Sequence, residues 1–209
     1  LTLDNGVAGA PPGSSNPTAR ADFFHELAAA VPTETARGKY FLTQSLWTGY
    51  GSAQNTPMVT NPRYDWFNIL AFAAEDLTPG PHSSIWVTME PNVSAWIGRG
   101  VAASKLVPIA PAFGLRYFGN TADYTWGNLW QFTEYIPYRT LCATYPNAPE
   151  TNTQPVDNGL WYDGLADVAQ KADYAQGQGW GGMGLWSVEN DALEPDKSLM
   201  HQINVSLAD

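Results

Sequence analysis

The stretch Gly181-Gly182-Met183-Gly184-Leu185-Trp186-Ser187-Val188-Glu189-Asn190-Asp191 decides the fold class of this chain. It is a short apolar run that follows glycines and leads into Trp, Ser, Glu, Asn and Asp. A strand covered on both faces is continuously apolar, so the run predicts a buried parallel strand whose last residues emerge into a site. Functional side chains are therefore expected at its carboxyl end, beginning with Trp186.

The residues before this strand predict a helix. Asp163 is placed to cap it, and Gly177 and Gly179 are placed to end it. Between them, apolar residues recur at helical spacing, namely Leu165, Val168, Ala169 and Ala172. A helix, a glycine break and a buried strand together form one α/β unit.

Four more strands are predicted earlier in the chain, at residues 1–4, 39–47, 65–72 and 105–114. Helices are predicted from Pro17 to Val31, around residues 93–99 and from Pro195 to about Leu207. Strands that alternate with helices favour a parallel sheet, so the fold class is α/β.

Two segments carry a resemblance to a known family. The sequence YDGLADVAQKADYAQGQGWGGMGLWSVEND, residues 162–191, resembles the last helix and strand of the family 18 glycoside hydrolases, which are chitinases and chitinase-like proteins. GVAASKLVPIAPAFG, residues 100–114, resembles the seventh strand of that family and its exit. The resemblance implies a (β/α)8 TIM barrel and a sugar groove at the carboxyl ends of its strands.

The five predicted strands correspond to the fourth through eighth of that family. About the first three βα units of the barrel are thus expected to be absent, and residues 1–209 are expected to form one partial barrel domain. Because an open half barrel exposes strand edges, we expect either a fragment or a companion chain that completes it. The start at Leu1, without a signal-peptide pattern, suggests a processed or truncated product.

Residues 115–160 delay the last unit far beyond the length of an ordinary βα loop. They are expected to form an insertion between strand 7 and the following helix, as in the resembling family, where it makes one wall of the groove. Its candidate ligand contacts are Tyr117, Trp126, Trp130 and Tyr138.

The catalytic motif of the resembling family is altered. That motif is Asp-x-x-Asp-x-Asp-x-Glu on the fourth strand, and its final Glu protonates the glycosidic oxygen. Aligning the loops puts Thr2, Asp4 and Gly6 at the last three positions, and Gly6 transfers no proton. A slip of two residues places Asp4 at the acid position, where the shorter side chain holds its carboxyl farther back. Asp4 is therefore the single catalytic candidate.

The sixth-strand site departs from the family as well. Leu70-Ala71-Phe72-Ala73 stands where Met-x-Tyr-Asp is common, Phe113 stands where Tyr is usual, and Asn68 matches a family Asn. These substitutions remove polar groups and keep apolar side chains, so they favour stacking of a sugar ring over catalysis. Trp186 is expected to form the floor under a sugar ring, with Trp47 or an insertion aromatic as a side wall. The predicted substrate-binding residues are Trp186, Trp47, Phe72, Phe113, Asn68, Trp126 and Trp130.

Composition limits the other functions. The formal net charge is −10, from 10 basic and 20 acidic residues, which argues against nucleic acid or an anionic membrane as a partner. The single Cys142 is expected to be a buried thiol. His25, His82 and His201 are far apart in sequence and have no Cys partner, so we expect neither a metal nor another cofactor. The sequons at Asn92 and Asn204 are compatible with secretion.

The leading hypothesis is a catalytically impaired, secreted chitinase-like protein that binds oligosaccharides or polysaccharides containing N-acetylglucosamine. One alternative is an active chitinase or endo-β-N-acetylglucosaminidase that acts by substrate-assisted catalysis. Another is a structural or storage barrel that uses no ligand.

Overall fold

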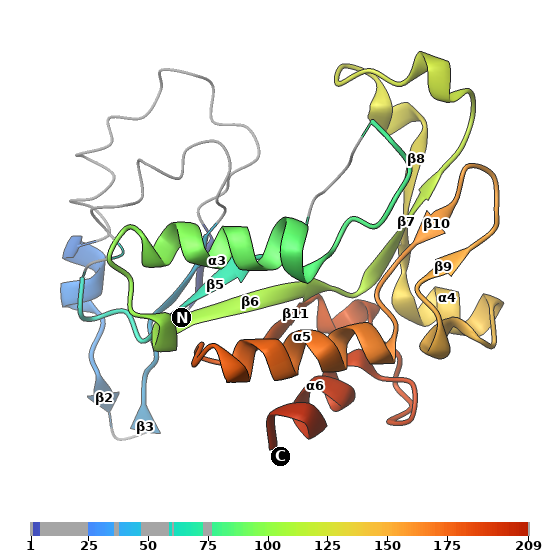
Figure 1. Cartoon of the computed structure of the whole chain (residues 1–209). Helices are drawn as coiled ribbons and strands as arrows, with labels where there is room; N and C mark the ends of the chain where they lie inside the picture. Colours follow the sequence, from blue (N-terminus) through green and yellow to red (C-terminus); the bar gives the residue numbers. More distant parts are fainter. Residues whose placement is uncertain are drawn as a thin grey trace.

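The computed structural model describes residues 2–4, 25–35, 38–46, 59, 61–72 and 77–208. Its centre is a five-stranded sheet in which every neighbouring pair is parallel. Strand order in the sheet follows chain order, as in a barrel. The strands are β1 (Thr2–Asp4), β4 (Thr43–Leu46), β5 (Trp66–Leu70), β6 (Leu106–Pro111) and β11 (Gly184–Trp186). The five strands expected from the sequence are confirmed, and they form an arc of a TIM-type barrel (Figure 1).

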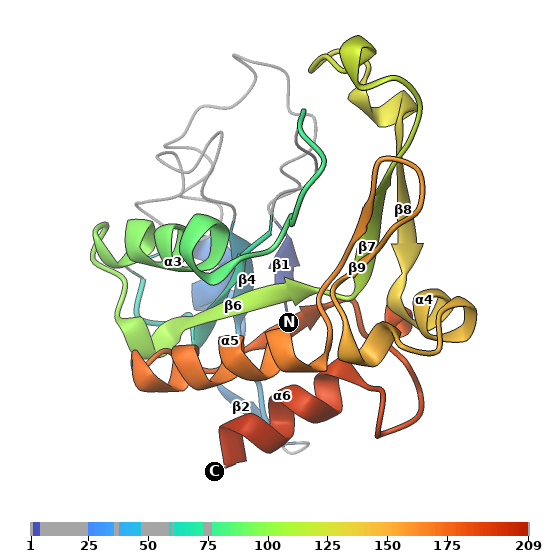
Figure 2. The same ribbon diagram turned by 45° about the vertical axis from the view of Figure 1, so that its right-hand side comes forward.

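Helices cover one face of this arc, which we call the outer face. Figures 1 and 2 show α3, α5 and α6 on that side of the strands. Phe67 and Ile69 of β5 point to it and pack with Val93 and Trp96 of α3 in one buried cluster. The helices of the outer face are α3 (Glu90–Ile97), which continues the π-helical turn η1 (Ile85–Met89), α5 (Leu165–Gly177) and α6 (Leu199–Ala208). Residues 25–30 are also helical.

Two helix boundaries differ from the sequence predictions, and a third is not tested. The helix expected around residues 93–99 begins at Ile85, because the Ser84 carbonyl accepts the backbone N–H groups of Thr88 and Met89. The described part of the first helix starts at His25, and residues 17–24 lie outside the described residues. The last helix begins at Leu199 instead of Pro195.

The predicted cap of α5 is wrong. Asp163 does not cap this helix, because its carboxylate pairs with Lys171 at 2.5 Å. Asp167, in the first turn, accepts the backbone N–H of Gly164 at 3.0 Å instead. Gly164 also has no room for a side chain, since a Cβ there would lie 2.2 Å from the Thr151 carbonyl oxygen.

The other face of the sheet, the inner face, carries Trp66, Asn68 and Leu70, which alternate with the buried residues of β5. A cavity of about 580 Å3 lies against it, between β5, β6 and the glycines that lead into β11. The sequence predicted β11 to be a buried strand. It is half-buried to exposed, because among the described residues β11 pairs with β6 alone and forms an edge of the five-stranded sheet.

The insertion rises beyond the carboxyl end of β6 (Figure 2). It is an antiparallel sheet in the order β8-β7-β10-β9, with the short helix α4 (Tyr138–Thr144) beside it. Its strands are β7 (Phe113–Tyr117), β8 (Thr133–Pro137), β9 (Thr153–Gln154) and β10 (Leu160–Trp161). Only Ala112 separates β6 from β7, so the parallel sheet leads directly into the insertion.

The remaining elements are short. The hairpin of β2 (Glu34–Thr35) and β3 (Gly38–Lys39) stands where the sequence predicted the start of a strand at Lys39, and β4 begins only at Thr43. The 3-10 turns are η2 (Ala103–Lys105), η3 (Thr121–Asp123), η4 (Leu129–Gln131), η5 (Ala148–Glu150) and η6 (Val188–Asn190). Among the described residues, no helix is both long enough and apolar enough to cross a membrane.

We expect Asp191→Ala to lower the free energy of unfolding by about 2–4 kcal/mol. The buried Asp191 carboxylate accepts the backbone N–H groups of Leu199 at 2.9 Å and Met200 at 3.0 Å, and the Ser198 hydroxyl at 2.7 Å, so its loss leaves the start of α6 without a cap. Urea unfolding measures the change. The exposed Asp196→Ala is the control, and an equal effect of both variants would contradict this role.

Candidate functional site

The carboxyl ends of the five parallel strands lie at the same end of the sheet, which we call its carboxyl edge, or simply the edge. Trp186, the last residue of β11, lies opposite Pro111, the last residue of β6. Leu70 ends β5 opposite Ile109, and the next residue, Ala71, donates its N–H to the Ile109 carbonyl at 3.2 Å. Asp4 ends β1 opposite Ser45. In barrels of this type the functional site is built at this edge.

Trp186 is an exposed aromatic residue at this edge. Its side chain is 44% exposed, although large aromatic rings are usually buried. Its carbonyl accepts the N–H of Ala112 at 2.6 Å, which ties the end of β11 to the exit of β6. Because strand residues alternate between faces, Trp186 shares the inner face with Gly184, whose Cα faces the Ile109 side chain. The peptide bond between Trp186 and Ser187 is cis.

Four rings form a cluster at the same edge, which we call the edge cluster: Phe72, His82, Phe113 and Tyr135. Phe113 is its centre. The Phe113 centroid lies 5.6 Å from that of Phe72 in an edge-to-face arrangement, 5.2 Å from the stacked ring of His82 and 5.0 Å from the ring of Tyr135. Such contacts hold aromatic rings in fixed positions.

The edge cluster has a buried and an exposed part. Phe72 and Phe113 are each 7% exposed and His82 is 3% exposed, whereas Tyr135 is 46% exposed. The Nε2 atom of His82 lies 3.2 Å from the Trp161 carbonyl oxygen, so the imidazole links the loop after β5 to the insertion. The three buried rings therefore hold the exposed phenol ring of Tyr135 in place.

Phe72 and Phe113, two of the predicted substrate-binding residues, are brought together at this edge. Asn68 lies two residues before the end of β5, on the inner face, where its Oδ1 accepts the Trp66 indole N–H at 3.1 Å. Trp126 and Trp130 lie toward the far end of the insertion and are 73% and 66% exposed.

Three of the predicted site positions are only partly described or not described. Trp47 and Gly6 lie outside the described residues. For Asp4 the structure describes the backbone in β1.

The expectation that Tyr117 and Tyr138 contact a ligand is wrong. Both side chains are 0% exposed, because they form the interior of the insertion and its junction with the barrel. An insertion of this size needs a core of its own, and these rings supply part of it.

His82 and Tyr135 were missed by the sequence reasoning. The antiparallel register places Tyr135 opposite Leu115 and thus diagonal to Phe113. The run from Thr133 to Pro137 has strand-like character, but nothing in it identifies its partner strand. For His82, its position in a Pro- and Gly-containing loop after a barrel strand was the available signal.

The described carboxylates near this edge are poorly suited to donate a proton. Glu189 follows β11 and is exposed, and a hydrogen bond from the Ser187 side chain lowers its pKa below that of an ordinary glutamate. Asp191 is occupied in capping α6, and Asp163 pairs with Lys171. General acid catalysis near neutral pH needs a carboxyl group with a raised pKa. In the part of the chain that the structure describes, no group of three or more His, Cys, Asp or Glu residues is placed to hold a metal ion.

Comparisons with known proteins agree with this geometry. The family model of the glycosyl hydrolases family 18 matches residues 11–191. No curated protein matches the sequence.

Solved structures with the same fold include both chitinases and a chitinase-like lectin. A chitinase from Bacteroides thetaiotaomicron has a TM-score of 0.70 at 15% identity, over 91% of this chain and 58% of the other. The chitinase-like agglutinin of Robinia pseudoacacia has a TM-score of 0.73 at 18% identity, over 99% and 67%. The class V chitinase of Nicotiana tobaccum, solved in complex with NAG4, has a TM-score of 0.72 at 17% identity, over 100% and 68%. This chain therefore spans between 58% and 68% of the length of these three proteins.

We expect an NMR titration of the Glu189 side chain to give a midpoint below about 4.3, the ordinary value for glutamate. The Ser187 hydrogen bond favours the ionised form, so the carboxylate persists to lower pH. Ser187→Ala should move the midpoint upward. A midpoint near 6 or above would identify Glu189 as a usable general acid and contradict this assignment.

Proposed function

The chain belongs to family 18 of the glycosyl hydrolases, and on that basis we propose that it is a catalytically impaired, chitinase-like protein that binds oligosaccharides containing N-acetylglucosamine. A location outside the cell is part of the same proposal. The ligand lies along the carboxyl edge of the sheet, on Trp186 and beside the edge cluster.

The single observation that carries this proposal is the exposed indole of Trp186 at the end of β11. A pyranose ring has an apolar face of C–H groups that packs on an aromatic ring, and hydroxyl groups at its rim that remain hydrogen-bonded. Tyr135, 46% exposed and held against Phe113 at 5.0 Å, provides a second amphipathic ring at the same edge. Two such rings suit more than one sugar unit.

The proposed identity of the sugar rests on the family. The tobacco chitinase was solved with NAG4, and the acetamide group of N-acetylglucosamine adds an apolar methyl and a planar amide to each ring. Phe72 and Phe113 give this chain an apolar base where the family commonly has tyrosines. A ligand held mainly by stacking and apolar contact fits such a base.

Impaired catalysis is inferred from lost polar groups. Gly6 or the short side chain of Asp4 stands at the position of the proton donor, and Ala73 stands where the sixth strand commonly carries Asp. Misplacing an acid by about 1 Å costs on the order of 100-fold in rate, and the loss of it costs more. Stacking on Trp186 needs none of these groups, so binding can persist without hydrolysis.

We expect tetra-N-acetylchitotetraose to bind saturably in isothermal titration calorimetry, with Trp186→Ala weakening the affinity at least tenfold, about 1.4 kcal/mol. Trp186→Phe keeps an aromatic face and should lose less. Val188→Ala is the control, because Val188 is 61% exposed two residues away. Since Trp186 is partly exposed, Trp186→Ala should change the free energy of unfolding by less than about 1 kcal/mol. Absence of saturable binding would favour a structural or storage role.

We expect no turnover of a chitotrioside with a fluorogenic leaving group by the same protein preparation that binds the tetrasaccharide. An enzyme without a placed acid cannot protonate the glycosidic oxygen efficiently. Turnover that is abolished by Asp4→Ala, while Asp196→Ala retains it, would instead establish the alternative of an active chitinase or endo-β-N-acetylglucosaminidase.

A further inference from the structure

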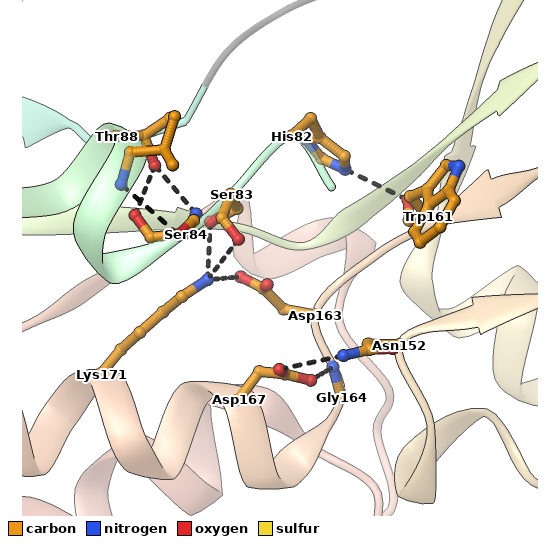
Figure 3. Close-up of polar contacts among 11 residues, drawn as sticks. His82, Ser83, Ser84, Thr88, Asn152, Trp161, Asp163, Gly164, Asp167 and Lys171 are labelled. Atoms are coloured by element: carbon orange, nitrogen blue, oxygen red, sulfur yellow. Dashed lines mark hydrogen bonds and ion pairs between the residues drawn. The ribbon is translucent and has the colours of Figure 1, made fainter. Parts of the chain in front are cut away.

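A second cavity, of about 220 Å3, lies on the outer flank of the fold, between the start of η1, the first turns of α5 and the insertion. We call it the flank pocket. Its lining includes Ser84, Trp86, Asn152, Asp167, Gln170 and Lys171. Figure 3 shows how the segment from His82 to Ser84 separates two environments: His82 points toward Trp161, while Ser83 points to Lys171. The flank pocket is thus distinct from the edge cluster.

At the base of the flank pocket, Lys171 and Asp163 form an ion pair in which the two charges neutralise each other. Lys171 Nζ lies 2.5 Å from the Asp163 carboxylate, 2.6 Å from the Ser83 hydroxyl and 3.4 Å from the Ser83 carbonyl oxygen (Figure 3). An ammonium group has three N–H donors, so these partners use all of them. Both side chains are at most 5% exposed. A charge already neutralised in this way does not recruit an anion.

The one other ionised group of the lining, Asp167, is also engaged. Its Oδ2 accepts the Gly164 N–H at 3.0 Å, and its Oδ1 accepts the Asn152 carboxamide at 3.2 Å. These bonds fix the carboxylate at the rim and orient Asn152. A carboxylate at this position disfavours phosphate and other anions, whereas its remaining lone pairs can accept ligand hydroxyls.

One wall of the flank pocket is the exposed Trp86, whose ring packs against other aromatic rings. The Trp86 side chain is 68% exposed, and its ring meets Tyr174 edge-to-face at 5.1 Å. Tyr174 in turn meets Trp180 at 5.5 Å. An indole of this exposure makes little contribution to the core, yet its orientation is set by two further rings. The lining also includes Gln170 and Asn152, which are exposed and carry carboxamides that both donate and accept hydrogen bonds.

We propose that the flank pocket is a second saccharide-binding site, which takes a single neutral pyranose ring. Trp86 packs on the apolar face of the ring, and Gln170, Asn152 and Asp167 bind its hydroxyl groups. The volume supports one ring, because it lies below the roughly 300–1,000 Å3 of pockets for larger ligands. This inference does not depend on the proposed function, since it shares no side chain with Trp186 or the edge cluster.

The test follows the indole N–H resonance of Trp86, assigned by its loss in Trp86→Phe, in 1H–15N NMR titrations of the whole chain. The probes are the methyl β-glycosides of N-acetylglucosamine, glucose, galactose and mannose, with inorganic phosphate as the anionic probe. We expect at least one glycoside to shift this resonance with a Kd of about 1–10 mM, and phosphate to leave it unchanged. Trp86→Ala should weaken that binding at least tenfold and Gln170→Ala several-fold.

Val87→Ala is the matched control, because Val87 is 77% exposed on the same turn and does not line the cavity. It and Trp186→Ala should both leave the flank affinity within about twofold of the original. The proposal is overturned if no glycoside shifts Trp86 up to about 50 mM, if phosphate alone does so, or if Trp86→Ala binds the glycoside unchanged. Failure of the proposed function would appear separately, as loss of tetrasaccharide binding at Trp186.

Discussion

The parallel pairing of β11 with β6 is the contact on which the rest of the site depends. It holds Gly184 against Ile109 and Trp186 against Pro111, one residue before the chain turns into the insertion. Glycines make this close approach possible: a Cβ at Gly181 would lie 2.6 Å from the Ser104 carbonyl oxygen, and Gly182 has a φ of +131° that other residues rarely adopt. This pairing fixes the position of Trp186 at the end of β11.

The same edge is the basis of the proposal that polar groups were lost while the apolar shape was kept. In the resembling family, tyrosines and acids surround the acetamide of the sugar, and here phenylalanines and an alanine occupy those positions. The phenylalanines are buried, and they support His82 and the exposed ring of Tyr135. Stacking of a sugar face on such a surface, as proposed above, needs no titrating group.

The insertion and the outer helices extend the protein surface beyond the carboxyl ends of the strands. Their side-chain contacts differ from those of the edge cluster. The large aromatic residues of the insertion fall into two groups. Tyr117 and Tyr124 lie in its core, whereas Trp126 and Trp130 are exposed. On the outer flank, Lys171 and Asp163 close a buried ion pair that connects α5 to the loop before η1. Breaking one partner of such a pair commonly costs about 3–5 kcal/mol, so this contact fixes how α5 packs and where Trp86 stands.

The sequence by itself determined the α/β class and the five strands, because apolar runs, helical spacing and glycines are local signals that need no partner. It also indicated Phe72 and Phe113 through the resemblance. It did not determine that Asp163 would pair with Lys171 instead of capping α5, that Tyr117 and Tyr138 would be buried, or that His82 and Tyr135 would meet on Phe113. Those outcomes were decided by the tertiary structure, since burial and ring contacts arise only when segments as distant as residues 72, 82, 113 and 135 pack against one another.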